Sequence, residues 1–191
     1  MIFKETMPPN VKITKDDIIN ASLEIVRTEG ADALNARRIA GKLNCSTQPV
    51  FSNFSTMDEL RRTLVAAAES LFWEYVKKER ESGEYPDYKA EGMAYIRFAQ
   101  EETELFKFLY MRDRTREDEQ TKGIDSVTLE MVEKATGFTD DAAKLFHLEM
   151  WAFVHGIAAI VSTHYLEIDR SLISEMISDI YFGISARHKK E

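Results

Sequence analysis

Apolar residues recur at the spacing of an α-helix in every long segment of this chain, and this pattern limits the fold more than any other feature. Ile18, Ala21 and Ile25 show it clearly, because positions i, i+3 and i+7 lie on one face of a helix. The sequence has no run of alternating β-branched residues of the kind that predicts a strand. It also has few residues that favour turns, with 4 prolines and 8 glycines among 191 residues. We therefore expect an all-α protein.

The first third of the chain predicts three short helices with a tight turn between the second and the third. Thr14 and Asn35 are residues that cap helix N-termini, and each precedes an apolar-periodic segment. Asn44 stands where a sharp turn needs a residue that tolerates the left-handed conformation. The third helix opens at Ser46 and Thr47. Two short helices joined by such a turn, braced by a first helix, indicate a helix-turn-helix module.

The remainder of the chain predicts further helices. Thr56 to Glu59 has the pattern of a capping box, which begins a long helix that runs to about Glu81. Gly83 and Pro86 then interrupt the chain. Beyond them, helical periodicity predicts helices over residues 88–100, 105–111, 124–135, 139–163 (capped by Thr139) and 172–188, with a charged loop at 112–120.

Charge is distributed unevenly along the chain. The net charge is −8, yet residues 1–62 carry a net charge of +1 and the remainder carries −9. No acidic residue lies between Asp32 and Asp58, whereas Arg37, Arg38 and Lys42 lie inside that window. A basic window on an acidic protein is expected if one small face meets phosphate groups.

The third helix would present its polar side outward, because Val50 and Phe54 belong to its apolar side. Gln and Asn side chains can bond to adenine edges in the major groove, and basic residues at a helix N-terminus suggest an external anion such as the DNA backbone. The candidate DNA-binding residues are Arg37, Arg38, Ser46, Thr47, Gln48, Phe51, Ser52 and Asn53.

The segment 33–54, followed by Met57-Asp58-Glu59-Leu60, resembles the N-terminal domain of tetracycline-repressor (TetR)-type regulators over about residues 14–62. Three positions depart from the usual family pattern: Asn44 replaces Gly, Phe51 replaces Tyr and so loses a phosphate contact, and Asn53 replaces a frequent His. The resemblance implies a flexible arm at 1–13, a helix-turn-helix domain at 14–62 and a helical ligand-binding and dimerisation domain at 63–191, the two domains being joined by a long helix. It also implies a homodimer that binds an inverted-repeat DNA operator and is released from it by a small, mostly apolar effector.

Two pieces of the C-terminal part resemble the same family. Residues 95–109 resemble the segment that leads into its ligand-sensing helices, and Trp151 with His155-Gly156 resembles a Trp…His-Gly pattern of one group of effector domains. A surplus of large side chains predicts a pocket for a small, mostly apolar effector. The alternative is that these side chains simply fill the domain. The candidate ligand-binding residues are Tyr95, Phe98, Phe106, Tyr110, Met111, His147, Met150, Trp151 and His155.

The stretch from Met150 to Val161 is apolar on every side except at His155. A helix of this kind must be covered on every side. One side would meet its own domain and the other a second subunit, although a central core helix in a monomer would satisfy the same pattern. The candidate dimer-interface residues are Gly156, Ala159, Ile160, Ile177, Ile180, Tyr181 and Ile184.

Other classes of function find little support. The motifs of phosphate-binding loops, serine hydrolases, zinc proteases and di-iron bundles do not occur. His147 and His155 are two helical turns apart, about 12 Å, which is too far to share a metal. The single Cys45 excludes an internal disulfide and a multi-cysteine metal site.

With neither a secretion signal nor 18 consecutive apolar residues, we expect a cytoplasmic protein with no membrane span, no metal and no cofactor. The alternatives to a ligand-responsive regulator are a DNA-binding protein that docks a partner protein and, less favoured, a helical enzyme.

Overall fold

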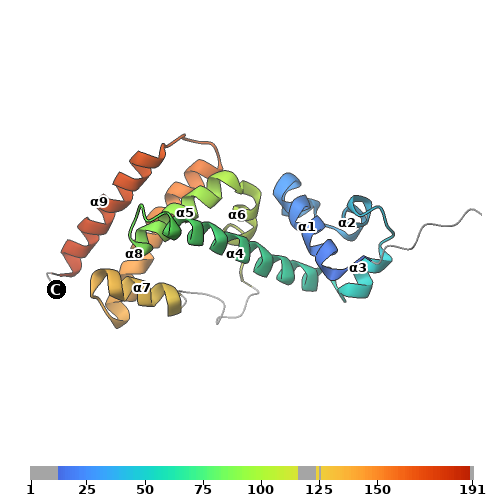
Figure 1. Ribbon diagram of the computed structural model, residues 1–191, viewed down its shortest axis with the longest axis horizontal. Coiled ribbons are helices and arrows are strands. Elements are labelled where there is room, and N and C mark those ends of the chain that lie inside the picture. Colours follow the sequence, from blue (N-terminus) through green and yellow to red (C-terminus); the bar gives the residue numbers. More distant parts are fainter. Residues whose placement is uncertain (1–12, 116–123, 125, 190–191) are drawn as a thin grey trace, which may run out of the picture. The chain divides into compact units, whose positions relative to one another are not determined.

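The computed structural model describes residues 13–115, 124 and 126–189, and every regular element among them is helical (Figure 1). The chain divides into two compact units, residues 1–67 and 68–191. The all-α fold predicted from helical periodicity is confirmed. Nearly all of the predicted N-terminal arm, and residues 116–120 of the predicted charged loop, lie outside the described residues.

The N-terminal unit contains α1 (Lys15–Glu29), the short 3₁₀ helix η1 (Ala31–Ala33), α2 (Ala36–Lys42), α3 (Gln48–Asn53) and the first part of α4 (Met57–Glu81). Contacts of α1 with α2, and of α2 with α3, hold the first three helices together. Its core consists of fully buried apolar side chains from α1, α2, α4 and α3 with its C-cap residue, namely Ile18, Val26, Ile39, Val50, Phe54, Leu60 and Leu64.

The predicted caps of the first two helices are confirmed. At α1 the backbone N–H of Thr14 donates to the Asp17 carboxylate (2.8 Å), and the N–H of Asp17 donates to the Thr14 hydroxyl (3.1 Å). At α2 the N–H of Arg38 donates to the Asn35 side-chain oxygen (3.0 Å). Asn44 has φ of 50° and so adopts the left-handed conformation that the turn before α3 requires.

The capping interactions differ from the prediction at three later helices. At α4 the N–H of Glu59 donates to Thr56, but the Glu59 carboxylate accepts from Ser55, one residue earlier than in a capping box. Thr139 stands at the N-cap of α8, but its side chain makes no capping hydrogen bond. The last helix begins two residues earlier than predicted, because the Asp169 carboxylate accepts from the N–H of Leu172 (2.9 Å).

The C-terminal unit contains the rest of α4 together with α5 (Asp87–Glu101), α6 (Thr103–Tyr110), α7 (Ser126–Thr136), α8 (Asp140–Ser162) and α9 (Arg170–His188). Helix α8 packs against α5, α7 and α9, and Figure 1 shows α5 and α8 side by side. The buried side of α8 includes Met150, Val154, Ile157 and Val161, whereas Leu148, Trp151 and Gly156 are exposed.

Helix α8 is also long and apolar enough, by length and composition alone, to cross a membrane. Its contacts with α5, α7 and α9 are those of the central helix of a helical domain. Within this domain the all-round apolar character that the sequence indicated is covered on one side only.

The Asn35 cap predicts a measurable stability effect. Replacing Asn35 by Ala leaves the N–H of Arg38 without its side-chain acceptor, so the free energy of unfolding should fall by about 1 kcal/mol. Replacement by Asp, which caps equally well, should leave it nearly unchanged. Denaturant unfolding followed by circular dichroism measures both; equal stabilities of N35A and N35D would contradict the capping role.

Candidate functional site

The predicted DNA-binding residues lie on α2, on α3 and in the turn between them. Arg37, Ser46 and Gln48 are exposed, and Phe51 exposes 54% of its surface despite being aromatic. Val50 and Phe54 are buried, as the predicted inward face of α3 requires. The structure therefore brings the predicted polar residues onto one short segment whose opposite side is held by the core.

Several of these side chains already have intramolecular partners. The Ser52 hydroxyl donates to the Gln48 carbonyl (2.9 Å), and the Asn53 amide donates to the Pro49 carbonyl (2.8 Å). Arg38 forms an ion pair with Glu29 of α1. Among the described residues, the side chains of Arg37, Ser46, Thr47 and Gln48 have no such partner. Arg37, Ser46 and Gln48 are also exposed, so these three are the most available of the polar candidates for contact with another molecule.

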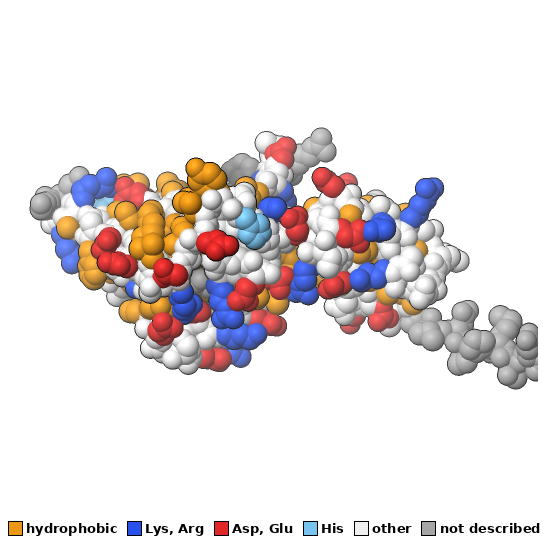
Figure 2. Space-filling view, turned by 90° about the horizontal axis from the view of Figure 1, so that it is seen from above, with side chains coloured by type: hydrophobic (Ala, Val, Ile, Leu, Met, Phe, Trp, Pro, Cys, Tyr) orange, Lys and Arg blue, Asp and Glu red, His pale blue; other side chains and the backbone are white. Residues whose placement is uncertain are grey.

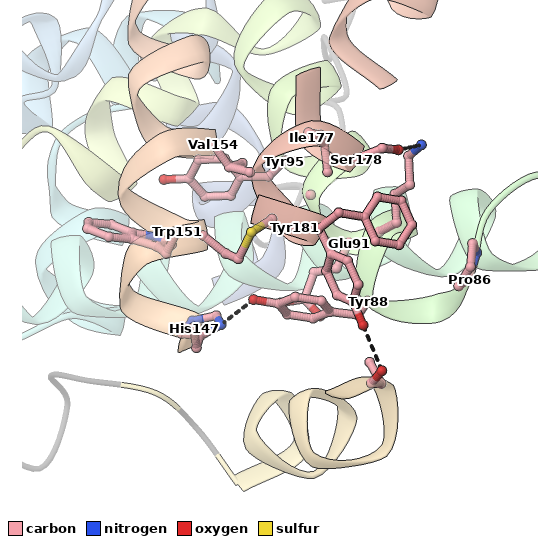
Figure 3. Close-up of a pocket in the computed structure, with 15 residues that line it drawn as sticks. Pro86, Tyr88, Glu91, Tyr95, His147, Trp151, Val154, Ile177, Ser178 and Tyr181 are labelled. Atoms are coloured by element: carbon pink, nitrogen blue, oxygen red, sulfur yellow. Dashed lines mark hydrogen bonds between the residues drawn. The ribbon is translucent and has the colours of Figure 1, made fainter. Parts of the chain in front are cut away.

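A cavity of about 400 Å³ lies in the C-terminal unit. Figure 3 shows its walls, which come mainly from α5, α8 and α9. Tyr88, Gly92 and Tyr95 of α5 line it, and apolar atoms make up most of its surface. From α8 it receives His147, Met150, Trp151 and Val154, and from α9 Ile177, Ser178, Tyr181 and Phe182. A volume of this size suits a small organic molecule.

Most polar groups of the cavity are bonded to neighbouring protein groups. The Tyr88 hydroxyl lies 3.1 Å from Nδ1 of His147, and the Tyr181 hydroxyl donates to the Ala135 carbonyl (2.7 Å) (Figure 3). The Glu91 carboxylate accepts from Arg80 (3.0 Å). Burial raises the pKa of Tyr88, so its hydroxyl stays protonated and can act as a donor. The cavity thus has an apolar surface with a few fixed polar points.

Four of the nine predicted ligand-binding residues line this cavity: Tyr95, His147, Met150 and Trp151. The other five lie elsewhere. Phe98 and Phe106 are fully buried and, with Tyr110, join an aromatic cluster around Phe72 and Tyr95. They fill the domain, which was the alternative interpretation of the sequence.

The last two predicted ligand-binding residues, Met111 and His155, lie neither on the cavity wall nor at the centre of the aromatic cluster. Met111 is half exposed, just beyond the end of α6. His155 does not line the cavity but contacts two residues that do: its Nδ1 lies 2.9 Å from the Tyr95 hydroxyl, and its ring stacks on Trp151. Desolvation lowers the pKa of His155, which favours its neutral form.

Sequence reasoning missed the first turns of α5 and most of the α9 wall. The signal was present in the spacing, because Tyr88, Glu91, Gly92 and Tyr95 stand at i, i+3, i+4 and i+7 and share one helix face. Helical period alone, however, does not tell a cavity wall from a core face.

The predicted interface residues also divide into two groups. Ile177 is buried and Tyr181 partly buried, and both line the cavity. Gly156 is exposed, and a Cβ atom added there would meet no atom within 4 Å. Partly exposed are Ala159, Ile160, Ile180 and Ile184.

Large apolar side chains remain exposed on the last two helices. Leu148 and Trp151 of α8 expose 57% and 41% of their surface, and Leu172 and Phe182 of α9 expose 45% and 67%. Figure 2 shows hydrophobic side chains gathered on one face of the C-terminal unit, bordered by charged groups. Apolar clusters of this kind are typical of surfaces that meet another molecule.

Comparison with known proteins places the C-terminal unit in a family. Residues 88–178 match the family described as tetracyclin repressor-like, C-terminal domain. This range includes the α5 and α8 walls of the cavity and the first part of α9. No protein with a curated description matches the chain.

Solved structures match nearly the whole chain. A TetR-like transcriptional regulator from Rhodococcus sp. RHA1 is 14% identical, with a TM-score of 0.65 over 93% of this chain and 97% of that one. A TetR family member from Streptomyces coelicolor A3 is 17% identical, with a TM-score of 0.60 over 86% and 96%.

The multidrug binding protein EbrR, complexed with imidazole, is 16% identical, with a TM-score of 0.56 over 86% and 88%. At these identities the likeness shows a shared fold. Residues 88–178 therefore belong to the tetracyclin repressor-like C-terminal domain family, and the chain has the fold of TetR-type transcription regulators.

Proposed function

We propose that this chain is a ligand-responsive transcription regulator that binds an inverted-repeat DNA operator as a homodimer and is released by a small, mostly apolar effector. The cavity between α5, α8 and α9 carries this proposal, since a regulator without an effector has no need of an apolar cavity of about 400 Å³. We further propose that the protein acts as a repressor, so that the regulated genes are expressed once the effector has released it from the operator. A regulator of this type acts in the cytoplasm.

The family consists of transcription regulators and not of enzymes. The cavity also favours a small molecule over a docked partner protein as the signal, because a concave apolar site of this volume fits a small molecule, whereas a partner protein would use a flatter exposed surface.

The surface of α2 and α3 supports the DNA-binding role. A helix-turn-helix inserts its second helix into the major groove, and the first residues of that helix contact base edges. Gln48 is the first residue of α3 and is exposed, so it is the best placed candidate for a base contact. Arg37, near the start of α2, is placed to contact a phosphate group.

Two substitutions should separate these roles. Gln48→Ala should relax the preference for one base pair, at a cost of about 1–3 kcal/mol in discrimination. Arg37→Ala should weaken binding to all sequences similarly and make the salt dependence shallower by about one unit of slope. Fluorescence anisotropy with fragments selected from random DNA measures both effects.

Arg38→Ala provides a matched control for Arg37. Because Glu29 already pairs with Arg38, removing Arg38 should weaken operator binding less than removing Arg37 does. If no fragment is enriched from random DNA, the operator-binding role is contradicted.

The exposed apolar residues of α8 and α9 support the homodimer. An inverted repeat requires two recognition helices about 34–36 Å apart, or somewhat more on a widened site, and two-fold symmetry supplies them. A second copy would cover Leu148, Trp151 and Phe182, which the isolated chain leaves in water.

Gly156 gives a clean test of this interface. A Cβ atom at position 156 would meet no other atom within 4 Å, so Gly156→Glu should leave the fold of the subunit intact. A charge at the interface should nevertheless produce monomers with much weaker operator binding, whereas Gly156→Ala should remain dimeric. Light scattering at micromolar concentration measures the mass; a dimeric G156E would refute this placement of the interface.

A variant that fills the cavity tests ligand binding. A Cβ atom at Gly92 would lie 3.5 Å from Val154 and 3.7 Å from Ile177, which are ordinary contact distances, so Gly92→Leu should extend into the cavity without a clash at its first atom. Replacing a glycine inside a helix also raises helix propensity, by up to about 1 kcal/mol. We expect G92L to be at least as stable as the wild type and to bind apolar molecules poorly.

Phenylnaphthylamine, a neutral apolar dye that fluoresces more strongly outside water, serves as the probe for this test. Titration should show binding to the wild type and to the control G92A, and little binding to G92L. Equal affinity for all three proteins would show that the dye binds elsewhere and would contradict the role of the cavity.

A further inference from the structure

Lys89 is the feature of the cavity that the proposed function leaves unexplained. It stands in the first turn of α5, lines the cavity and is partly buried. Its ammonium donates to the Ser178 hydroxyl (2.8 Å) and lies over the Tyr85 ring, 4.9 Å from the ring centre. Neither of these partners carries a negative charge.

The carboxylates around Lys89 have arginine partners instead. Glu91, which also lines the cavity, is held by Arg80 at 3.0 Å. Glu84 accepts from Arg170 at 2.8 Å. Within the part of the chain that the structure describes, no carboxylate lies within ion-pair distance of Lys89. The cavity therefore contains a neutralised acid and a base that lacks an ion pair.

The surroundings of Lys89 also weaken its hydration. Desolvation by burial lowers the pKa of Lys89, while the charge of Glu84 acts in the opposite direction with a smaller effect. A partly desolvated ammonium without an ion pair is stabilised by an anion that enters its site, through a charge-assisted hydrogen bond.

We infer that the effector is an amphipathic organic anion, whose apolar body lies between α5, α8 and α9 and whose acid group binds Lys89. This inference rests on the proposed function, because it names the chemical class of the molecule that the cavity takes. The apolar body would contact Tyr88, Tyr95 and Trp151, which are large flat side chains.

A cationic effector is the main competitor. The aromatic faces of the cavity would attract a cation. A cation in this cavity would, however, meet the Lys89 ammonium, and the carboxylate that could balance it is already occupied by Arg80. The charged groups of the cavity therefore favour the anion.

Three probes with the same body and different charges test the inference: phenylbutanoate, phenylbutanamide and phenylbutylamine. A second trio, naphthylacetate with its amide and its amine, controls for the shape of the body. Each is measured on the full-length chain by displacement of phenylnaphthylamine and by calorimetry. The wild type should bind each acid about tenfold more tightly than its amide, and each amine most weakly.

Substitutions at Lys89 test whether its ammonium causes the tighter binding of the acids. Lys89→Met keeps the length of the side chain and removes its charge, so the acids should lose about tenfold in affinity and the amides less than about twofold. Retained binding of the amides would show that the cavity is intact. Lys89→Arg should preserve the order of affinities, and Lys77→Met, a change at an exposed lysine outside the cavity, should alter nothing.

The possible failures are distinguishable. If the amides or amines bind the wild type as tightly as the acids, or if K89M keeps the preference for acids, the inference is overturned while the cavity remains a ligand site. If no probe displaces the dye from the wild type, the inference and the ligand-binding part of the proposed function both fail.

Discussion

The apolar character of α8 on all its sides is the constraint on which the C-terminal unit depends. Contact between the apolar side chains of such a helix and water destabilises the fold. The neighbouring helices therefore have to cover it. Helices α5, α7 and α9 cover one side, burying Met150, Val154 and Ile157. They do not close completely over it, and the cavity lies where Gly92 of α5 provides no side chain. The exposed side, with Leu148 and Trp151, is left for a second copy in the proposed dimer.

The N-terminal unit depends instead on local interactions. Caps at Thr14 and Asn35 and the left-handed turn at Asn44 determine where each short helix begins and ends. Val50 and Phe54 then hold α3 to the core through its buried side. The polar side of α3 is therefore presented to the outside on a firmly held helix, which is what recognition of a base edge requires.

Local signals explain why the fold could be predicted from the sequence and the site only in part. Caps, left-handed positions and helical period are encoded by neighbouring residues, so the helices and the α3 core face could be predicted with small errors such as the Asp169 cap. A cavity depends on which helices meet, and that information is not local. The size of Tyr95 and Trp151 makes them candidates from the sequence alone. Gly92 shares a helix face with Tyr88 and Tyr95, but helical period does not tell a cavity wall from a core face, and neither Gly92 nor Lys89 has a side chain that suggests an apolar pocket. For the same reason the size of Phe98 and Phe106 suggests pocket residues, whereas both side chains are buried in the core.

The central claim is that the C-terminal cavity and the DNA-binding surface are energetically coupled. The most direct test is the operator affinity of the wild-type protein, measured with and without a saturating concentration of a ligand shown to occupy the cavity. The account predicts that the ligand weakens operator binding by about 5–150-fold, and that operator DNA weakens ligand binding by the same factor. An operator affinity that does not change while the ligand is bound would contradict it.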